Sequence, residues 1–264
     1  MFESNSDLEA NTAGKQMTRT EYPAGRAVPD PSRASVKTVV RAPDDSRFTA
    51  PLYTVRQVAS YLREPENTVW YWVRGRGMSE PLVTWRPSPR RNEAEVPFIG
   101  LAEALVVSAL RHRGFGVHYI RGALDKLAEE MTLDYALASR SLYHDGARIL
   151  FRYSSPREDF KPLAEVLSQQ YLLVESNLEL ITFEPDGWAG RLVLPFAKDR
   201  PLIEVDPNRA FGKPIFVNGG ARLQDVIARL RARDSIQEVA DDFGVPEEDV
   251  LDILRAFLPP SEAA

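Results

Sequence analysis

The chain has 264 residues, of which 44% are hydrophobic and 27% charged, a composition typical of globular proteins, and its length favours about two domains. It contains no cysteine, which excludes disulfides, thiolate metal sites and thiol nucleophiles. The net charge of −5 is unevenly spread: residues 53–121 have ten basic and six acidic side chains, residues 122–264 have 16 and 25, so affinity for nucleic acid is expected in the first half.

Residues 1–50 mix Ser, Thr, Pro, Gly, Asn and charged residues without a sustained apolar period, as in PAGRAVPDPSRAS. Such a segment buries too little apolar surface to offset the entropy lost on folding. The sequence therefore predicts a disordered tail over residues 1–50.

A helical pattern begins at Tyr53. The segment YTVRQVASYL (residues 53–62) has apolar residues at intervals of three and four, and TVWYWVR (residues 68–74) repeats the pattern after the turn-like REPEN. Two short helices joined by a tight turn are expected, and RGRG ends the second.

The next segment predicts a basic hairpin and two supporting helices. Leu82–Trp85 and Val96–Ile99 are typical of short strands around the turn-rich RPSPRRNEAE. Leu101–His112 is a strongly apolar helix, and Val117–Met131 is a second one after the break RGFG.

Residues 148–196 change to a period near two. The segments ARILFRYS, QYLLVES, LELITFE and RLVLPF indicate strands of a small sheet, with PLAEVLSQQ as a possible helix. The turn-rich PLIEVDPNRAFGKPIFVNGG then leads to three short helices, Leu223–Ala232, Ser235–Phe243 and Glu247–Phe257.

The second helix of the first pair has the two faces that a DNA-recognition helix needs. Val69, Trp72 and Val73 share one side, which can pack against the preceding helix, and the opposite side carries polar and Arg side chains that can reach base edges and phosphates. Trp70 lies at the margin. The basic hairpin adds arginines where a wing would meet the DNA backbone. The candidate DNA contacts are Thr54, Arg56, Asn67, Thr68, Tyr71, Arg74, Arg76, Arg86, Arg90 and Arg91. A helical hairpin whose polar face meets only water, followed by a solvated loop, is the alternative.

Two segments resemble known families. YTVRQVASYLREPENTVWYWVRGRG with the following PFIGLAEALVVSALRHRGFGVHYIRGALDKLAEE resembles the MerR-type winged helix-turn-helix with its supporting helices. The segment from IEVDPNRAFGKPIFVNGG to DVLDILRAF resembles the small C-terminal domain of many bacterial antitoxin-like proteins. Together they resemble a subgroup of VapB-type antitoxins, which implies DNA binding, repression of the protein's own operon and neutralisation of a PIN-type ribonuclease toxin.

Some positions depart from these patterns. Glu64 occupies a turn position that is usually apolar in the MerR-type reader, and Trp70 stands where a basic residue is common. The segment NGGAR (residues 218–222) replaces the usual Gly-Thr-Arg. By position, the resemblance implies that Gly212, Lys213, Pro214 and Arg222 define the C-terminal fold.

The last two helices resemble a second DNA reader in outline, but Glu247, Glu248 and Asp249 begin the final helix and would repel phosphates. We therefore expect dimer or partner contacts from this end. The helix before them carries a basic edge, and its candidate partner-binding residues are Arg222, Arg229, Arg231 and Arg233. A helix face exposed only to solvent explains these arginines equally well.

Catalysis, metal binding and membrane insertion are not expected. His112 and His118 are six residues apart and straddle a break, whereas a helical ligand pair needs four, and His144 is remote. No phosphate loop, nucleophile elbow or acid/base pair is recognisable. No run approaches the roughly 18 apolar residues that span a bilayer, and no basic-then-apolar leader is present. We expect a cytoplasmic, nucleoid-associated protein without cofactor, metal or membrane contact.

The predicted fold class is mainly α with a small β portion (α+β), with a winged helix-turn-helix head, a β-rich middle and a three-helix C-terminal domain. The expected division is a tail over 1–50, a head over 51–131, a middle over 132–200, a C-terminal domain over 201–258 and a short tail over 259–264. The predicted function is that of a DNA-binding antitoxin acting as a homodimer on double-stranded operator DNA. The alternatives are a MerR-like regulator without a toxin, whose C-terminal domain dimerises or senses a ligand, and a protein-interaction adaptor that binds no DNA.

Overall fold

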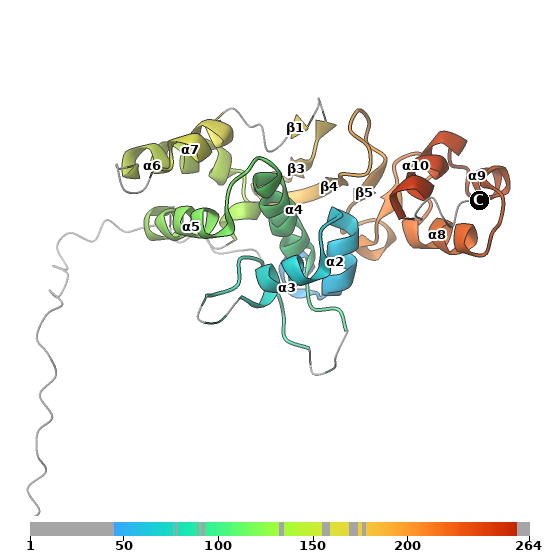
Figure 1. Ribbon diagram of the computed structural model, residues 1–264, viewed down its shortest axis with the longest axis horizontal. Coiled ribbons are helices and arrows are strands. Elements are labelled where there is room, and N and C mark those ends of the chain that lie inside the picture. The colour runs from blue at the N-terminus through green and yellow to red at the C-terminus, as the bar shows by residue number, and fades with distance from the viewer. Residues whose placement is uncertain are drawn as a thin grey trace, which may run out of the picture. The chain divides into compact units, whose positions relative to one another are not determined.

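The computed structural model describes residues 45–257 except 76, 78, 89, 91–92, 132–134, 155–158, 169–173 and 176–177, and these belong to one compact unit, Lys37–Ala264. Helices predominate, and a small antiparallel sheet accompanies them (Figure 1). The predicted α+β class is confirmed. No helix in the described ranges is long and apolar enough to cross a membrane.

The head begins with three short helices, α1 (Ser46–Thr49), α2 (Val55–Leu62) and α3 (Glu66–Arg74). Thr54 caps α2 through a capping box, in which its hydroxyl accepts from the Gln57 amide and the Gln57 side chain accepts from the Thr54 amide. The paired helices and the turn between them match the prediction.

The predicted tail extends too far, because residues 45–50 are folded. Phe48 of α1 is buried and stacks edge-on against Tyr135 and Trp188. Arg47 forms ion pairs with Asp45 and with Asp186. Except for Asp45, these partners lie more than 80 residues from α1 in the sequence. The composition of residues 1–50 therefore could not reveal that α1 is folded. The rest of the predicted tail, residues 1–44, lies outside the described residues.

The predicted wing strands are wrong. Residues 81–96, here called the wing loop, contain no strand among their described residues; Arg86 donates its amide to the Glu95 carbonyl at 2.7 Å, and Val96 forms an isolated bridge with Tyr53. Ile99 lies inside a helix. Pro97, with its fixed φ, caps that helix and ends the extended segment.

Helix α4 (Phe98–His112) is the central helix of the head. All residues from Phe98 to Leu110 are buried, and the helix contacts α1, α2, α5 (Val117–Met131) and the sheet strand β4. A helix that is apolar on every side is stable only when it is surrounded, which explains why this segment shows no polar face.

The middle region is partly helical where strands were expected. ARILFRYS forms α6 (Ala147–Tyr153), which packs against α5 and α7 (Lys161–Ser168). The alternation of apolar residues misled the prediction, because a short apolar run does not separate strand from helix by period alone. The possible helix in PLAEVLSQQ is confirmed as α7. Single turns precede α6: η2 (Ala136–Ala138) and η3 (Leu142–Gly146).

The sheet has the order β3-β4-β5-β6 and is antiparallel throughout. Its strands are β3 (Ile181–Phe183), β4 (Ala189–Leu194), β5 (Ile203–Val205) and β6 (Ile215–Phe216), and a separate hairpin pairs β1 (Val174–Glu175) with β2 (Leu178–Glu179). The domain boundary expected after residue 200 therefore falls within a continuous sheet.

The three C-terminal helices are confirmed as α8 (Leu223–Arg231), α9 (Ile236–Phe243) and α10 (Glu247–Phe257). Ser235 and Glu238 form a capping box at the start of α9, and Gly244 ends it with a left-handed φ of 62°. Gly219 (φ +82°) turns the chain from β6 toward α8, and a Cβ there would lie 2.4 Å from the Gly244 carbonyl oxygen.

Candidate nucleic-acid interface

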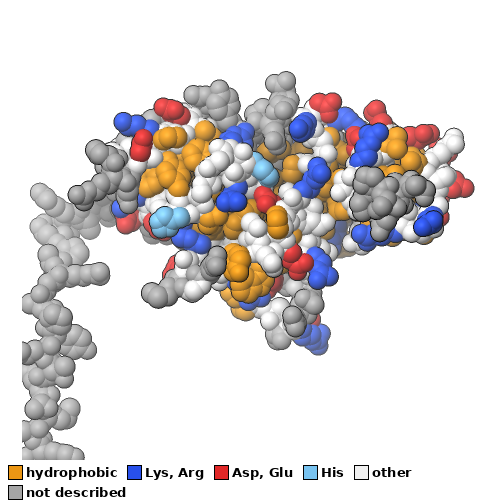
Figure 2. Space-filling view, in the orientation of Figure 1, with side chains coloured by type: hydrophobic (Ala, Val, Ile, Leu, Met, Phe, Trp, Pro, Cys, Tyr) orange, Lys and Arg blue, Asp and Glu red, His pale blue; other side chains and the backbone are white. Residues whose placement is uncertain are grey.

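Helix α3 has the predicted buried and exposed faces. Val69, Trp72 and Val73 are buried, whereas Asn67 and Tyr71 are exposed. Thr68 is half-buried, and Trp70 is 48% exposed, with its ring edge-on to Tyr71. In Figure 2, apolar side chains reach the surface beside basic and acidic ones in the region where Figure 1 places α2 and α3. This surface combines hydrogen-bonding groups and aromatic rings, as base-edge and sugar contacts require.

Arg74 extends from α3 but is held within the head. It forms an ion pair with Glu95, whose side chain is only 11% exposed, and its guanidinium lies 4.2 Å from the centroid of the Trp85 ring. Because Glu95 is nearly enclosed, Arg74 neutralises a charge that would otherwise be buried alone. A contact with DNA would have to share or replace this carboxylate.

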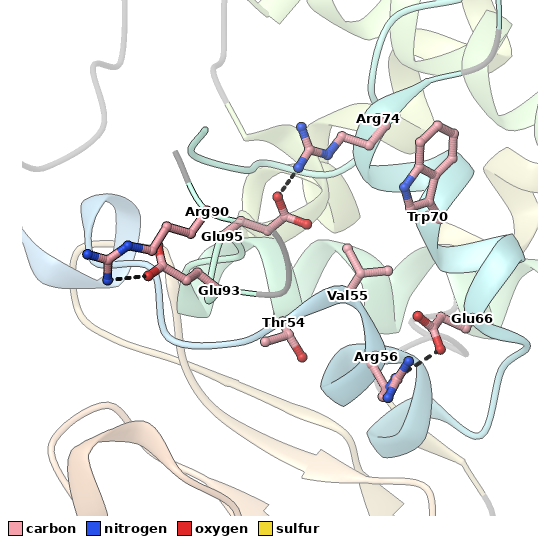
Figure 3. A pocket seen from close by; sticks show the side chains of 9 residues that line it. All are labelled: Thr54, Val55, Arg56, Glu66, Trp70, Arg74, Arg90, Glu93 and Glu95. Carbon is pink, nitrogen blue, oxygen red and sulfur yellow. Dashed lines mark hydrogen bonds and ion pairs between the residues drawn. The ribbon is translucent and has the colours of Figure 1, made fainter. Parts of the chain in front are cut away.

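Two further predicted arginines are also paired with glutamates. Arg56 of α2 lies 3.2 Å from Glu66 of α3, and Arg90 of the wing loop lies 3.2 Å from Glu93. Together with Arg74 they surround a groove of about 380 Å³, here called the wing-side groove. Figure 3 shows each arginine beside its own glutamate, so these six charges sum to zero.

The remaining predicted contacts have structural roles or lie outside the described residues. Arg86 points inward and donates to the Phe48 carbonyl at 3.2 Å, and Thr54 caps α2. Arg76 and Arg91 fall outside the described residues.

A second groove on the other flank of α3, here called the α3–α5 groove, was not predicted. It has a volume of about 350 Å³, and its described lining includes Thr68 and Tyr71 from α3, Arg111 from α4, and His118 and Arg121 from α5. The sequence contains these cations, but its apolar periodicity predicts α4 and α5 only as supporting helices of the head.

Glu64, the polar residue at a turn position that is usually apolar, has two side-chain partners on α4. Its carboxylate accepts a hydrogen bond from the Ser108 hydroxyl at 2.6 Å and lies 3.8 Å from His112 Nε2. Ser108 and His112 of α4 therefore accommodate this departure. Within the described ranges, no cluster of three or more His, Asp or Glu side chains could hold a metal ion.

The predicted basic edge of α8 is largely paired. Arg222 forms an ion pair with Asp225, and Arg229 pairs with Asp234 and Asp242. Arg231 and Arg233 are exposed. Of the four predicted partner-binding cations, Arg231 and Arg233 therefore form no ion pair within the described part of the chain.

One large apolar side chain that the sequence does not single out is exposed to solvent. Phe211 of η4 (Ala210–Gly212) is 87% exposed, and both Ala210 and Phe211 have positive φ, 47° and 56°. Non-glycine residues in the left-handed region are strained, and such strain gathers at functional positions. In the sequence, Phe211 lies within the turn-rich segment PLIEVDPNRAFGKPIFVNGG and directly precedes Gly212, Lys213 and Pro214, the only residues there that the resemblance marks as fold-defining.

Head and C-terminal region contact each other directly. The Tyr53 hydroxyl donates to the Gly212 carbonyl at 2.5 Å, and the Lys213 ammonium donates to the Leu52 carbonyl at 2.9 Å. Burial lowers the pKa of Lys213. Two of the four expected fold-defining residues thus attach the C-terminal region to the entrance of α2.

Two segments of the chain match known families, and a known protein is similar to most of its length. Residues 51–124 match a family described as "Putative DNA-binding HTH domain", and residues 203–255 match one described as a protein of unknown function (DUF433). A protein of Mycobacterium tuberculosis (strain ATCC 25618 / H37Rv) named "Putative antitoxin VapB45" is 35% identical over 230 residues, covering 80% of this chain and 95% of that protein. The crystal structure of Rv2018 from Mycobacterium tuberculosis matches with a TM-score of 0.65 and 34% identity, over 79% of this chain and 99% of that one.

The similarity to VapB45 covers four fifths of this chain, 80%, and nearly the whole of that protein, 95%. The chain therefore belongs to the VapB45 family of VapB-type antitoxins.

Proposed function

We propose that this chain is the DNA-binding antitoxin of a toxin–antitoxin pair, which recognises the operator of its own operon through α3 and neutralises a PIN-type ribonuclease by binding it. The observation that carries the proposal is the α2–α3 unit. The apolar face of this unit is buried, and the face that carries Asn67 and Tyr71 is exposed. The unit lies within residues 51–124, which match a DNA-binding family, and the chain as a whole is similar to a protein named as an antitoxin.

Repression requires two copies of the head. One recognition helix contacts only a few base pairs, and a two-fold homodimer on a palindromic operator supplies the remaining length and affinity. We assign Asn67, Thr68 and Tyr71 to the DNA-facing surface. Arg56, Arg74 and Arg90 would join it by exchanging glutamate for phosphate. The protein would then act in the cytoplasm, on nucleoid DNA.

DNA binding is tested by fluorescence anisotropy with a duplex that covers the DNA directly upstream of the gene, between about 50 and 200 mM salt. Specific binding with an affinity that falls steeply with salt is expected, and Tyr71→Ala should weaken it. An upstream duplex that binds no better than a scrambled duplex would remove the operator assignment. No salt-sensitive binding to either duplex would leave the interaction-adaptor alternative.

Toxin binding is tested by co-expression with the nuclease encoded beside this gene. Phe211 is the side chain we expect to enter the toxin, because it is apolar, exposed and held in a strained turn. Phe211→Ser should lower the recovery of the complex and the rescue of growth, whereas Trp70→Ala, which removes an exposed ring on the head, should not. If no nuclease gene adjoins this one, or no complex forms, the chain is a transcription regulator without a toxin.

A further inference from the structure

The α3–α5 groove differs in charge from the wing-side groove. No Asp or Glu stands among the described residues that line it, whereas Arg111, His118 and Arg121 all do. In the wing-side groove each described arginine has a glutamate partner. Net positive potential on this part of the head therefore lies on the α5 flank of α3.

The two arginines of the α3–α5 groove are held differently. Arg111, in the last turn of α4, is exposed and has no carboxylate partner in the described part of the chain. Arg121 donates to the backbone carbonyl of Glu80, which fixes its guanidinium without neutralising the charge. One cation is thus positioned at the groove, and the other is available to a ligand.

Polar groups suited to an anion complete the lining. Thr68 and Ser79 contribute hydroxyls, and the lining also includes Val117 and His118, the first two residues of the 15-residue helix α5, whose backbone amides start that helix. These amides have no carbonyl partner within the helix, and the helix dipole adds positive potential there. Hydroxyls, free amides and guanidinium groups are the donors that bind phosphate oxygens in protein–DNA complexes.

We propose that the α3–α5 groove holds a backbone phosphate of the bound DNA, with Arg111 as its principal cation; this rests on the proposed DNA-binding function. Thr68 and Tyr71 belong both to this lining and to the outer part of α3. A phosphate seated here would therefore fix the register of the recognition helix. The salt dependence of binding arises on this flank more than from the glutamate-paired arginines of the wing side.

The test is fluorescence anisotropy of the full chain with the upstream duplex and with a scrambled duplex, across the same salt range. Arg111→Gln should weaken binding to both duplexes by a similar factor and reduce the slope of log affinity against log salt by about 1, the signature of one lost phosphate contact. Arg111→Lys should retain most of the slope. Arg152→Gln, which removes an exposed cation in the last turn of α6, is the matched control and should change neither quantity.

The outcomes separate this proposal from the proposed function. Thermal unfolding of Arg111→Gln should match wild type, because the side chain is exposed. If wild type binds DNA and Tyr71→Ala weakens binding, but Arg111→Gln has an unchanged slope, the groove proposal is overturned and the DNA-binding function stands. If wild type binds neither duplex, the DNA-binding function itself fails.

Discussion

The Tyr53 hydroxyl donates a hydrogen bond to the carbonyl of Gly212, 159 residues later in the chain. Tyr53 is completely buried at the entrance of α2 and also pairs through its backbone with Val96 at the end of the wing loop. Gly212 has a φ of +70°, and a Cβ there would lie 2.9 Å from Leu52 Cδ1. The Tyr53–Gly212 contact thus joins the head to the C-terminal region at a position that only glycine fits well.

Tyr53→Phe should lower the free energy of unfolding by about 1 to 3 kcal/mol, because the buried Gly212 carbonyl loses its donor. Urea unfolding measures the change. Tyr61→Phe is the matched control: Tyr61 lies edge-on to Tyr53, and its hydroxyl has no hydrogen-bond partner in the described chain, so it should change stability by less than about 0.5 kcal/mol. Equal effects of the two substitutions would show that the Tyr53–Gly212 contact contributes little.

The helices of the head and of the C-terminal region could be predicted because their local sequence signals agree with one another. Val69, Trp72 and Val73 share one face of α3, and Ser235, Glu238 and Gly244 mark the limits of α9. Each of these signals acts within one or two turns of its own helix.

The features that sequence reasoning missed depend on distant partners. The folding of Phe48 requires Tyr135 and Trp188, and α6 is helical because α5 and α7 cover it. Likewise, the sequence shows that Arg74 and Glu95 exist, but their pairing follows from how the wing loop returns to α3. A list of candidate cations therefore could not distinguish paired arginines from available ones.

Substitution of the two neighbouring tryptophans of α3 should separate folding from binding. Trp72 is 1% exposed, and Trp72→Ala should cost about 3 to 5 kcal/mol as a core truncation. Trp70 is 48% exposed, so Trp70→Ala should stay within about 0.5 kcal/mol of wild type while weakening operator binding. Denaturant unfolding measures the stability of the two variants, and fluorescence anisotropy measures their binding to the operator duplex. Loss of stability in Trp70→Ala with little change in Trp72→Ala would mean that the buried and exposed faces of α3 are exchanged.

The Arg74–Glu95 pair should contribute to stability as well as to binding. Arg74→Ala leaves Glu95 nearly enclosed without its cation and removes the contact with Trp85, so we expect a loss of about 1 to 2 kcal/mol. In a double-mutant cycle with Glu95→Gln, the coupling energy should be about 1 kcal/mol. The exposed pair Arg90–Glu93 is the control, and its coupling should be close to zero. A coupling at Arg74–Glu95 no larger than at Arg90–Glu93 would contradict this assignment.

Glu103 should make stability depend on pH. It is fully buried in α4, and burial raises its pKa to about 7, although its carboxylate accepts a hydrogen bond from the Thr84 amide at 2.6 Å. In the unfolded chain its pKa is about 4.3. Between these two values the folded state keeps a proton that the unfolded state has lost, so the contribution of Glu103 to stability falls as pH rises from about 4 to about 7.

Above pH 7 the full penalty, roughly 4 kcal/mol, should be present. Glu103→Gln removes the titration while retaining an oxygen that can accept from Thr84. The difference in unfolding free energy between this variant and wild type should therefore grow in favour of the variant as pH rises from 5 to 8, as measured by urea unfolding at each pH. Glu248→Gln, at an exposed position of α10, should follow the wild-type curve. A difference between Glu103→Gln and wild type that is constant across this pH range would show that Glu103 is ionised in the folded protein throughout, with its charge stabilised by the Thr84 amide at the base of the wing loop.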